Sequence, residues 1–172
     1  ARQTVARLKK GRRAEELEQF ALNDSMTGMY NRNAYDYFVK NEKDFEGYVI
    51  VTFDLNNLKQ CNDQYGHRAG DEYIINAAHI IEDNFERYGK CYRIGGDEFC
   101  CIIPKGRYFK IERVMHKIDQ DVEILNHKNI IPVPVGIAYG YAVFTADDTD
   151  PEKVRERADK DMYRNKKTMK QS

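Results

Sequence analysis

The chain has 172 residues with 28 basic and 28 acidic side chains, so its formal net charge is zero. This length allows one domain with a real core and is too short for two domains of ordinary size. The balanced charge gives no reason to expect nucleic acid or a membrane surface as a partner, and no apolar run is long enough to span a bilayer.

The first 23 residues are charged, free of proline and prone to form a helix. Their apolar residues fall at helical spacing on both sides of Gly11, but the stripe is too thin to form a core by itself. One interpretation is a linker helix that pairs with its own copy, and the alternative is a frayed tail. We divide the chain into this N-terminal helix, residues 1–23, and a main domain, residues 24–172.

Residues 24–28 contain turn formers, and Asn31 is a candidate N-cap for a helix that continues to about Val39. A β-branched and aromatic run, residues 47–53, predicts a central strand that ends at Asp54. A carboxylate at the end of a buried strand, before a short loop and a helix, is a typical ligand position in proteins with helices and strands.

Residues 56–66 predict a loop with a short helix, and residues 70–85 predict a longer helix with His79 on its surface. A further helix is predicted over residues 108–126. Residues 133–144 predict a strand whose start is marked by Pro132 and Pro134. Pro151 opens a final helix, which we expect to direct three side chains inward: Ala158, Met162 and Tyr163.

Two strand-like runs, residues 91–94 and 99–103, flank the sequence Gly95-Gly96-Asp97-Glu98 and predict a β-hairpin. The two glycines can take positive φ and leave room above the turn for a bulky ligand. Asp97 and Glu98 should point to opposite faces, so at most one of them faces a given metal directly. A hairpin among alternating helices and strands predicts an α+β fold whose sheet is mixed but mainly antiparallel and is flanked by helices.

Four cysteines lie at positions 61, 91, 100 and 101 and lack the spacing of a zinc site. We expect them to be reduced packing residues of a cytoplasmic protein. Because the chain does not begin with Met, we also expect it to be a segment of a longer protein.

The hairpin residues are one of four spaced blocks that resemble the GGDEF family of diguanylate cyclases, over about residues 22–170. The other blocks are Asp24-x-x-Thr27-Gly28-x-x-Asn31-Arg32, Asp54-x-Asn56-x-x-Lys59-x-x-Asn62-Asp63-x-x-Gly66-His67-x-x-Gly70-Asp71 and Ala158-Asp159-x-x-Met162-Tyr163-x-x-Lys166.

This resemblance implies a palm-like nucleotide cyclase fold and the condensation of two GTP into cyclic di-GMP with release of two pyrophosphates. Each domain would hold one GTP, so catalysis needs a homodimer. The resemblance also implies a cytoplasmic output domain of a bacterial signalling protein, with an upstream sensor that a membrane could carry. The N-terminal helix would relay the signal, and the first turn and Arg32 would support the active site.

Forming a phosphodiester from a nucleoside triphosphate requires a neutralised polyphosphate and an activated hydroxyl, and divalent metals held by carboxylates supply both. Mg²⁺ or Mn²⁺ is therefore the expected cofactor, and Lys59 joins the two hairpin carboxylates as a catalytic candidate. The candidate metal ligands are Asp54, Asp97 and Glu98, together with the Leu55 carbonyl that the resemblance implies.

Asn62 and Asp71 match the family's guanine-reading pair, since an Asp can accept from the N1 and N2 hydrogens of guanine. The alternative is helix capping, because Asp71 lies near a predicted helix start after Gly70 and Asn62 lies in a predicted turn. The remaining substrate-binding candidates are Leu58, Lys59, His67, Lys166 and Lys170, with Lys59 and the last two serving phosphate.

Three residues depart from the family pattern: Lys170 replaces the usual arginine, Asn56 a common aspartate and Leu58 a common phenylalanine. The product-inhibition motif Arg-x-x-Asp is also missing, since its window here, residues 86–89, reads Glu-Arg-Tyr-Gly. Lys170 and Asn56 keep open an alternative function, a non-catalytic GGDEF-like module that binds GTP or a partner and transmits a signal. The intact candidate residues argue against this alternative: Asp54, Asp97, Glu98, Asn62 and Asp71.

Overall fold

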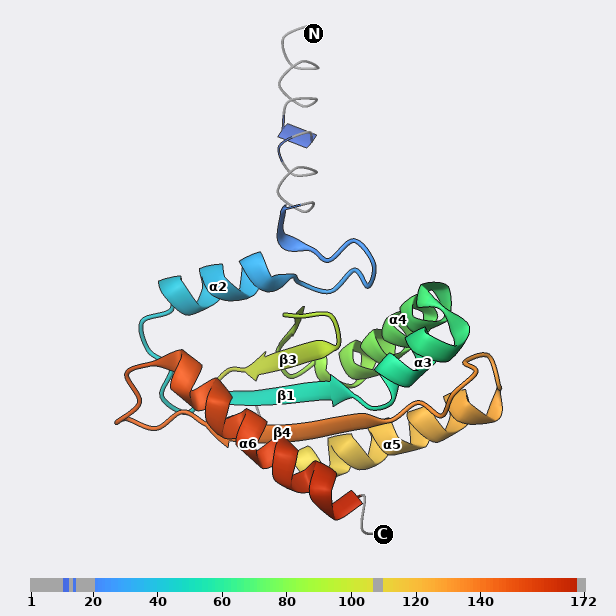
Figure 1. Cartoon of the computed structure of the whole chain (residues 1–172). Helices are drawn as coiled ribbons and strands as arrows, with labels where there is room; N and C mark the ends of the chain where they lie inside the picture. The colour runs from blue at the N-terminus through green and yellow to red at the C-terminus, as the bar shows by residue number, and fades with distance from the viewer. Residues whose placement is uncertain (1–10, 13, 15–20, 107–109, 170–172) are drawn as a thin grey trace, which may run out of the picture.

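The structure, a computed structural model, describes residues 11, 12, 14, 21–106 and 110–169. Helices and strands are interspersed along the chain and pack around one sheet (Figure 1). The elements are α2 (Arg32–Asn41), β1 (Val49–Leu55), α3 (Leu58–Tyr65), α4 (His67–Phe85), β2 (Lys90–Arg93), β3 (Glu98–Ile103), α5 (Ile111–His127), β4 (Ile137–Val143) and α6 (Pro151–Met169).

The four strands lie in the order β2-β3-β1-β4, and each of the three ladders is antiparallel. A parallel contact occurs at one isolated bridge, between Tyr30 and Tyr92. The expected α+β fold with a mainly antiparallel sheet is therefore confirmed. The β2–β3 hairpin is also confirmed, and it places β2 at an edge of the sheet.

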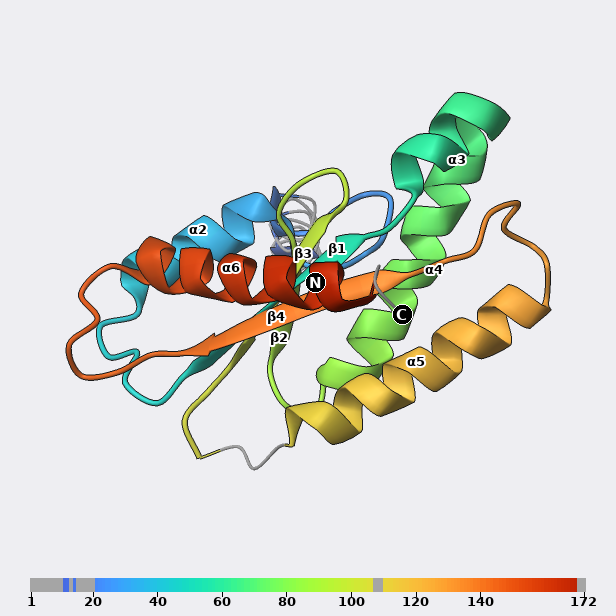
Figure 2. The same ribbon diagram turned by 60° about the horizontal axis from the view of Figure 1, so that its bottom comes forward.

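Helices cover both faces of the sheet, as the alternation of strand side chains requires. Val51, Phe53 and Leu55 of β1 pack in one core with residues of α4 and α5. Ile50 packs in a second core with residues of α2 and α6. Figure 2 shows α6 and α4 on opposite sides of the strands.

Two predicted helix starts are confirmed, and both follow from local chemistry. Asn31 caps α2, because its side-chain oxygen accepts a hydrogen bond of 3.0 Å from the Ala34 amide. Pro151 is the first residue of α6, where its missing N–H costs no helical hydrogen bond. None of the helices in the described ranges is both long and apolar enough to cross a bilayer.

Some boundaries differ from the prediction. Strand β1 continues one residue past its predicted end, to Leu55, so Asp54 is the penultimate residue of the strand. Strand β4 begins only at Ile137, because Pro132 and Pro134 cannot donate to a ladder. Tyr163 was expected to point inward, but it is exposed because it lies off the face of α6 that carries Val154 and Ala158 into the core.

Helix α4 begins at His67, and Gly66 serves as its N-cap at a φ of 85°. The helix therefore starts before residue 70, and Asp71 lies within it, so the capping alternative for Asp71 is wrong. The predicted helix over residues 1–23 falls largely outside the described residues; those described among them at positions 11, 12, 14, 21 and 22 are helical.

Candidate functional site

Asp54 and Glu98 lie side by side on the sheet. The register of β1 and β3 pairs them directly across the antiparallel ladder, and opposed residues share a face with Cβ atoms about 5 Å apart. Asp54 points to the face that α6 covers, since it alternates with the neighbouring core residues Phe53 and Leu55 on the other face. Glu98 is therefore the hairpin carboxylate that lies next to Asp54.

Lys166 of α6 reaches this carboxylate pair from the last helix. Its ammonium forms an ion pair and a hydrogen bond with the Asp54 carboxylate, and the two side chains are about a quarter exposed. Two adjacent carboxylates repel each other, and a nearby cation relieves that repulsion. The structure thus brings a predicted phosphate-binding lysine to a predicted metal ligand.

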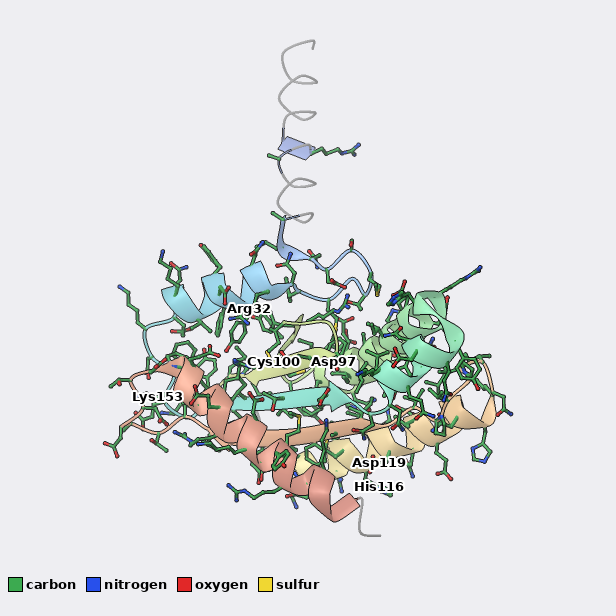
Figure 3. The ribbon with its side chains drawn as sticks, viewed as in Figure 1. Arg32, Asp97, Cys100, His116, Asp119 and Lys153 are labelled. Atoms are coloured by element: carbon green, nitrogen blue, oxygen red, sulfur yellow. The ribbon has the colours of Figure 1, made fainter. Side chains whose placement is uncertain are left out.

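Asp97 lies in the turn just before β3 and contacts β1 through its backbone. Its carbonyl accepts a hydrogen bond of 3.4 Å from the Leu55 amide. Figure 3 labels Asp97 at the turn end of β3 and Cys100 further along the same strand. Asp97 and Leu55, both predicted metal ligands, are therefore neighbours at the point where the hairpin meets β1.

The two hairpin glycines match the expectation only in part. Neither Gly95 nor Gly96 has a positive φ. A Cβ on Gly95 would lie 2.9 Å from a carboxylate oxygen of Glu98, so the missing side chain gives Glu98 room to fold over the turn. A Cβ on Gly96 would meet no atom within 4 Å, so the expected space above the turn is present at Gly96.

Arg93 holds the hairpin turn to the loop before α2. Its guanidinium donates to the Gly96 carbonyl at 2.9 Å and pairs with the Asp24 carboxylate at 3.1 Å. Burial acts to raise the pKa of Asp24, but hydrogen bonds from Thr27 and Arg93 outweigh it and hold this pKa below its usual value. The turn at residues 24–28 was expected to support the site, and the ion pair between Asp24 and Arg93 ties it to the hairpin. Arg32 was expected to do the same, but it pairs with Asp36 on the surface of α2.

The residues present fit Mg²⁺ or Mn²⁺ bound together with a nucleotide. Within the described ranges, no group of three or more His, Cys, Asp or Glu side chains is placed to hold a metal. Mg²⁺ in nucleotide sites is commonly held by one or two carboxylates and the substrate phosphates. Asp54 and Glu98 provide such a pair, and the Leu55 carbonyl adds an oxygen beside them.

The packing of α3 on α4 places Asn62 against Gly70, the residue just before Asp71. A Cβ on Gly70 would lie 1.9 Å from the side-chain oxygen of Asn62, so the Asn62 amide group occupies the space above the Gly70 backbone. Asp71 is the next residue of α4 and is exposed. The predicted guanine-reading pair therefore lies at one helix–helix contact.

The loop between β1 and α3 is fixed by Asn57 and Tyr73. Asn57 has a left-handed backbone with a φ of 63°, which Asn tolerates better than most residues. The Tyr73 hydroxyl donates to the Asn56 carbonyl at 2.6 Å and accepts from the Gly136 amide at 2.8 Å. Desolvation of this hydroxyl raises the pKa of Tyr73 to about 12, so it stays protonated and keeps both bonds.

The other predicted substrate-binding residues are spread over this region. Lys59 is exposed in the first turn of α3, and His67 is exposed at the start of α4. Leu58 is only 7% exposed and belongs to the core beneath the loop. Lys170 lies outside the described residues.

Sequence reasoning missed three supporting residues: Arg93, Tyr73 and Gly70. Gly70 stands inside a quoted motif block and Arg93 lies in the strand-like run just before the hairpin turn, so their positions could have drawn attention to them. Nothing in the local sequence around Tyr73 distinguishes it from an ordinary core residue on a helix.

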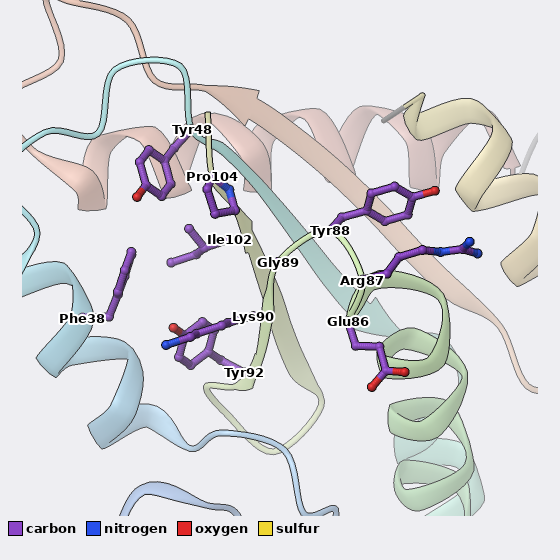
Figure 4. A pocket seen from close by; sticks show the side chains of 10 residues that line it. All are labelled: Phe38, Tyr48, Glu86, Arg87, Tyr88, Gly89, Lys90, Tyr92, Ile102 and Pro104. Carbon is purple, nitrogen blue, oxygen red and sulfur yellow. The ribbon is translucent and has the colours of Figure 1, made fainter. Parts of the chain in front are cut away.

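The window of the missing inhibitory motif, residues 86–89, lines part of a cavity of about 260 Å³. Figure 4 shows Arg87 pointing away from Phe38 and Tyr48, which line the other side of this cavity. The Arg87 guanidinium carbon lies 5.3 Å from the centre of the Tyr88 ring. For Arg87 to take the place of the missing motif arginine, its side chain would have to turn. That cyclic di-GMP does not inhibit through residues 86–89 stays a prediction.

Comparison with known proteins matches residues 21–172 to the family described as diguanylate cyclase, GGDEF domain. The chain is 30% identical over 172 residues to the bifunctional diguanylate cyclase/cyclic di-GMP phosphodiesterase MucR of Pseudomonas aeruginosa, covering 95% of this chain and 24% of MucR. It is 29% identical over 158 residues to diguanylate cyclase DgcS of Shewanella oneidensis, covering 88% of this chain and 52% of DgcS. The chain thus spans about a quarter to a half of these relatives.

Among solved structures, the chain is similar to the coiled coil and GGDEF domain of DgcB from Caulobacter crescentus in complex with c-di-GMP. The TM-score is 0.77 at 23% identity, over 96% of this chain and 92% of that chain. The expected palm-like fold is therefore confirmed.

Proposed function

This chain belongs to the GGDEF family of diguanylate cyclase domains, and from that premise we propose that it condenses two GTP into cyclic di-GMP and two pyrophosphates. The observation that carries the proposal is the cross-strand pair of Asp54 and Glu98 with Lys166 beside it. Two adjacent carboxylates repel each other at a cost in stability, which a nearby cation offsets. A site for a polyphosphate and its metal accounts for all three side chains.

Asp54, Glu98 and the Leu55 carbonyl are the proposed metal ligands, with Asp97 at the adjoining turn. Bound Mg²⁺ or Mn²⁺ supplies charge neutralisation and a more acidic attacking hydroxyl. Asp97 also keeps the hairpin against β1 through its carbonyl. Arg93 holds the turn in place, so both hairpin carboxylates start from a fixed backbone.

Lys166 and Lys59 are the proposed phosphate-binding cations. Lys166 sits at the site already, on a flexible four-carbon stem that can turn its ammonium from Asp54 to a phosphate oxygen. Lys59 stands exposed just after the loop that follows β1. Lys170 is proposed for the same role from the sequence alone.

Guanine selection is assigned to Asn62 and Asp71, with Leu58 and His67 nearby on α3 and α4. A carboxylate that accepts from the N1 and N2 hydrogens of guanine would face an acceptor on adenine. Unpaired polar groups of this kind give strong discrimination between substrates. The Gly70 backbone leaves the space in which the Asn62 side chain lies.

The proposed assembly is a homodimer in which each domain presents one GTP to the other. We also propose the division into a linker helix, residues 1–23, and a cyclase domain, residues 24–172. In the full-length protein an upstream sensor would act through this helix.

The test is to incubate the purified chain, at high concentration, with GTP and Mg²⁺ and to resolve the products by chromatography. We expect cyclic di-GMP and pyrophosphate from the parent, and none from the Asp54→Asn variant, which should still fold and unfold cooperatively. The matched control is Asp83→Asn, an exposed carboxylate near the far end of α4, which should leave turnover as it is.

GTP binding without any product from the parent, in a protein shown to be dimeric, would overturn the proposal in favour of the non-catalytic module. Normal turnover by Asp54→Asn would instead show that the carboxylate pair is not the metal site. The two results are distinguishable because binding and turnover are measured separately.

A further inference from the structure

Cys91 and Cys101 face each other in the interior of the β2–β3 hairpin. They are cross-strand partners in the ladder, and Cys101 Sγ donates to Cys91 Sγ over 2.7 Å. Both are free thiols, and they are 3% and 0% exposed. The two sulfur atoms are therefore already adjacent across the hairpin.

The backbone at this pair also suits a disulfide. Opposed residues in an antiparallel ladder alternate between hydrogen-bonded and non-hydrogen-bonded pairs. The Ile94 amide donates to the Glu98 carbonyl at 3.0 Å, so these two opposed residues form a hydrogen-bonded pair. Cys91 and Cys101 lie three positions further along the ladder, and the alternation therefore makes them a non-hydrogen-bonded pair. Such pairs have Cα atoms about 4.5 Å apart, which lies within the range of about 4.4–6.8 Å that disulfides span.

Cys100 stands next to Cys101 in sequence but belongs to the opposite face of the sheet. Cys91 and Cys101 lie in the core beneath α4 and α5, whereas Cys100 lies in the core with α2 and α6. Neighbouring strand residues point apart, so Cys100 cannot reach Cys91 while the hairpin is formed.

We propose that Cys91 and Cys101 are a modification site, a cross-strand disulfide that forms reversibly and fastens the root of the hairpin that carries Asp97 and Glu98. The proposal is independent of cyclase activity, since it rests on the two thiols and the register alone. The disulfide would close residues 92–100, including the whole Gly-Gly-Asp-Glu turn, into a covalent loop.

A small-molecule disulfide such as oxidised glutathione is the class of oxidant. One protein thiolate attacks it and releases one glutathione thiol, and the second protein thiol then displaces the other. The oxidant's S–S bond breaks and the Cys91–Cys101 bond forms, so the two electrons and two hydrogens lost by the protein reduce the oxidant to two thiols.

The reaction should be slow, because the thiols are buried. Burial raises the pKa of the Cys101 thiol well above its usual value, and its hydrogen bond to Cys91 adds to this; the attacking thiolate is therefore scarce. Access requires β2 to separate from β3. As the edge strand, β2 has a ladder on one side only and a single bridge to Tyr30 on the other, so this opening breaks one ladder.

The test treats the chain with oxidised glutathione, alkylates the remaining thiols under denaturing conditions and maps the tryptic peptides by mass spectrometry. Cleavage after Lys90, Arg93 and Lys105 separates Cys91, in residues 91–93, from Cys100 and Cys101, in residues 94–105. We expect these two peptides to be joined, less two hydrogens, and to separate again after reduction.

The variants decide which cysteines take part. Cys100→Ser is the matched control and should keep the joined peptides, while Cys101→Ser and Cys91→Ser should abolish them. An internal bond within residues 94–105, or alkylation of all four cysteines after prolonged oxidation, would overturn the proposal. Joined peptides in Cys101→Ser but not in Cys100→Ser would overturn it as well.

A second readout does not depend on peptide mapping. Closing a short loop restricts the unfolded chain, so the oxidised parent should melt on the order of 5 °C above the reduced parent. Cys101→Ser should show no difference between oxidising and reducing conditions. An oxidised parent that melts at the temperature of its reduced form would contradict a disulfide that fastens the hairpin.

Discussion

Gly70 matters at the level of a single residue because the side-chain oxygen of Asn62 lies where its β-carbon would be. The contact involves the end of a short, rotatable side chain and not the backbone. Asn62 can therefore move away from a methyl group without disturbing the helices, but it would then leave the position from which we propose that it reads guanine.

We expect Gly70→Ala to weaken GTP binding by about tenfold, equivalent to one lost hydrogen bond of about 1.4 kcal/mol. Stability should hold or rise by up to about 1 kcal/mol, because Ala is the better helix former. Titration calorimetry with GTP and urea unfolding measure the two quantities.

The control is a double-mutant cycle with Asn62→Ala. If Gly70→Ala acts through Asn62, the double variant binds GTP no more weakly than Asn62→Ala alone. Additive losses would show that Gly70 serves the site by some other contact.

The Asp24–Arg93 ion pair predicts a pH-dependent contribution to stability. The pKa of Asp24 is lowered in the folded chain, so its stabilisation is present above the ordinary pKa of about 3.9 and is lost as the pH falls through the lower folded value. Asp24→Asn should therefore cost about 1.5 kcal/mol at pH 7, and the cost should shrink toward pH 3.

Urea unfolding of both proteins between pH 7 and pH 3 checks this expectation. Asp83→Asn, which removes an exposed carboxylate, should match the parent throughout. A cost for Asp24→Asn that is equal at every pH would mean that packing, and not charge, holds the loop to the hairpin.

Among the elements, α6 depends on a close approach to β4. A Cβ on Gly140 would lie 2.1 Å from the Met162 amide nitrogen and 2.2 Å from the Ala158 carbonyl oxygen. These are backbone atoms in the middle of α6, so the helix itself would have to move. Because α6 also carries Lys166 to Asp54, its position affects both the core and the proposed phosphate site.

Gly140→Ala should lower the free energy of unfolding by at least about 2 kcal/mol, since backbone overlap adds to the usual cost of overpacking. Thermal and urea unfolding measure the loss. Gly96→Ala is the control for stability, because a Cβ there meets no atom within 4 Å. Equal stability of the two variants would show that α6 shifts without cost.

For the whole molecule, the proposed reaction needs two domains, since each would bring one GTP. One chain provides a single carboxylate pair, one group of lysines and one proposed guanine-reading pair. A single domain would therefore hold only one GTP. A complex that can react forms only when two domains associate.

We expect the specific activity of the chain to rise with protein concentration and to level off once most of it is dimeric. Turnover per milligram, measured over about a hundredfold range of concentration alongside sedimentation, checks this. Mixing in an excess of the Asp54→Asn variant should lower the activity per parent chain, whereas an excess of Asp83→Asn should not. Constant specific activity in a protein that stays monomeric would contradict the dimer.

The sequence by itself determined the features that depend on neighbours in the chain. It predicted the β2–β3 hairpin, the Asn31 cap, the start of α6 at Pro151 and the position of Asp54 at the end of a central strand, because turn residues, caps and residue alternation act over a few positions. The spaced blocks around these residues also indicated the family. Strand and helix ends were less predictable, since ladder hydrogen bonds and packing set them.

Only the tertiary structure decided which of these residues meet. The register of β1 and β3 places Glu98, and not Asp97, beside Asp54. The docking of α6 brings Lys166 to Asp54 across 112 positions of the chain, and the packing of α3 on α4 sets Asn62 over Gly70. Such contacts depend on how the helices pack against the two faces of the sheet. This packing joins residues that are far apart in the chain, so a local sequence pattern cannot predict it.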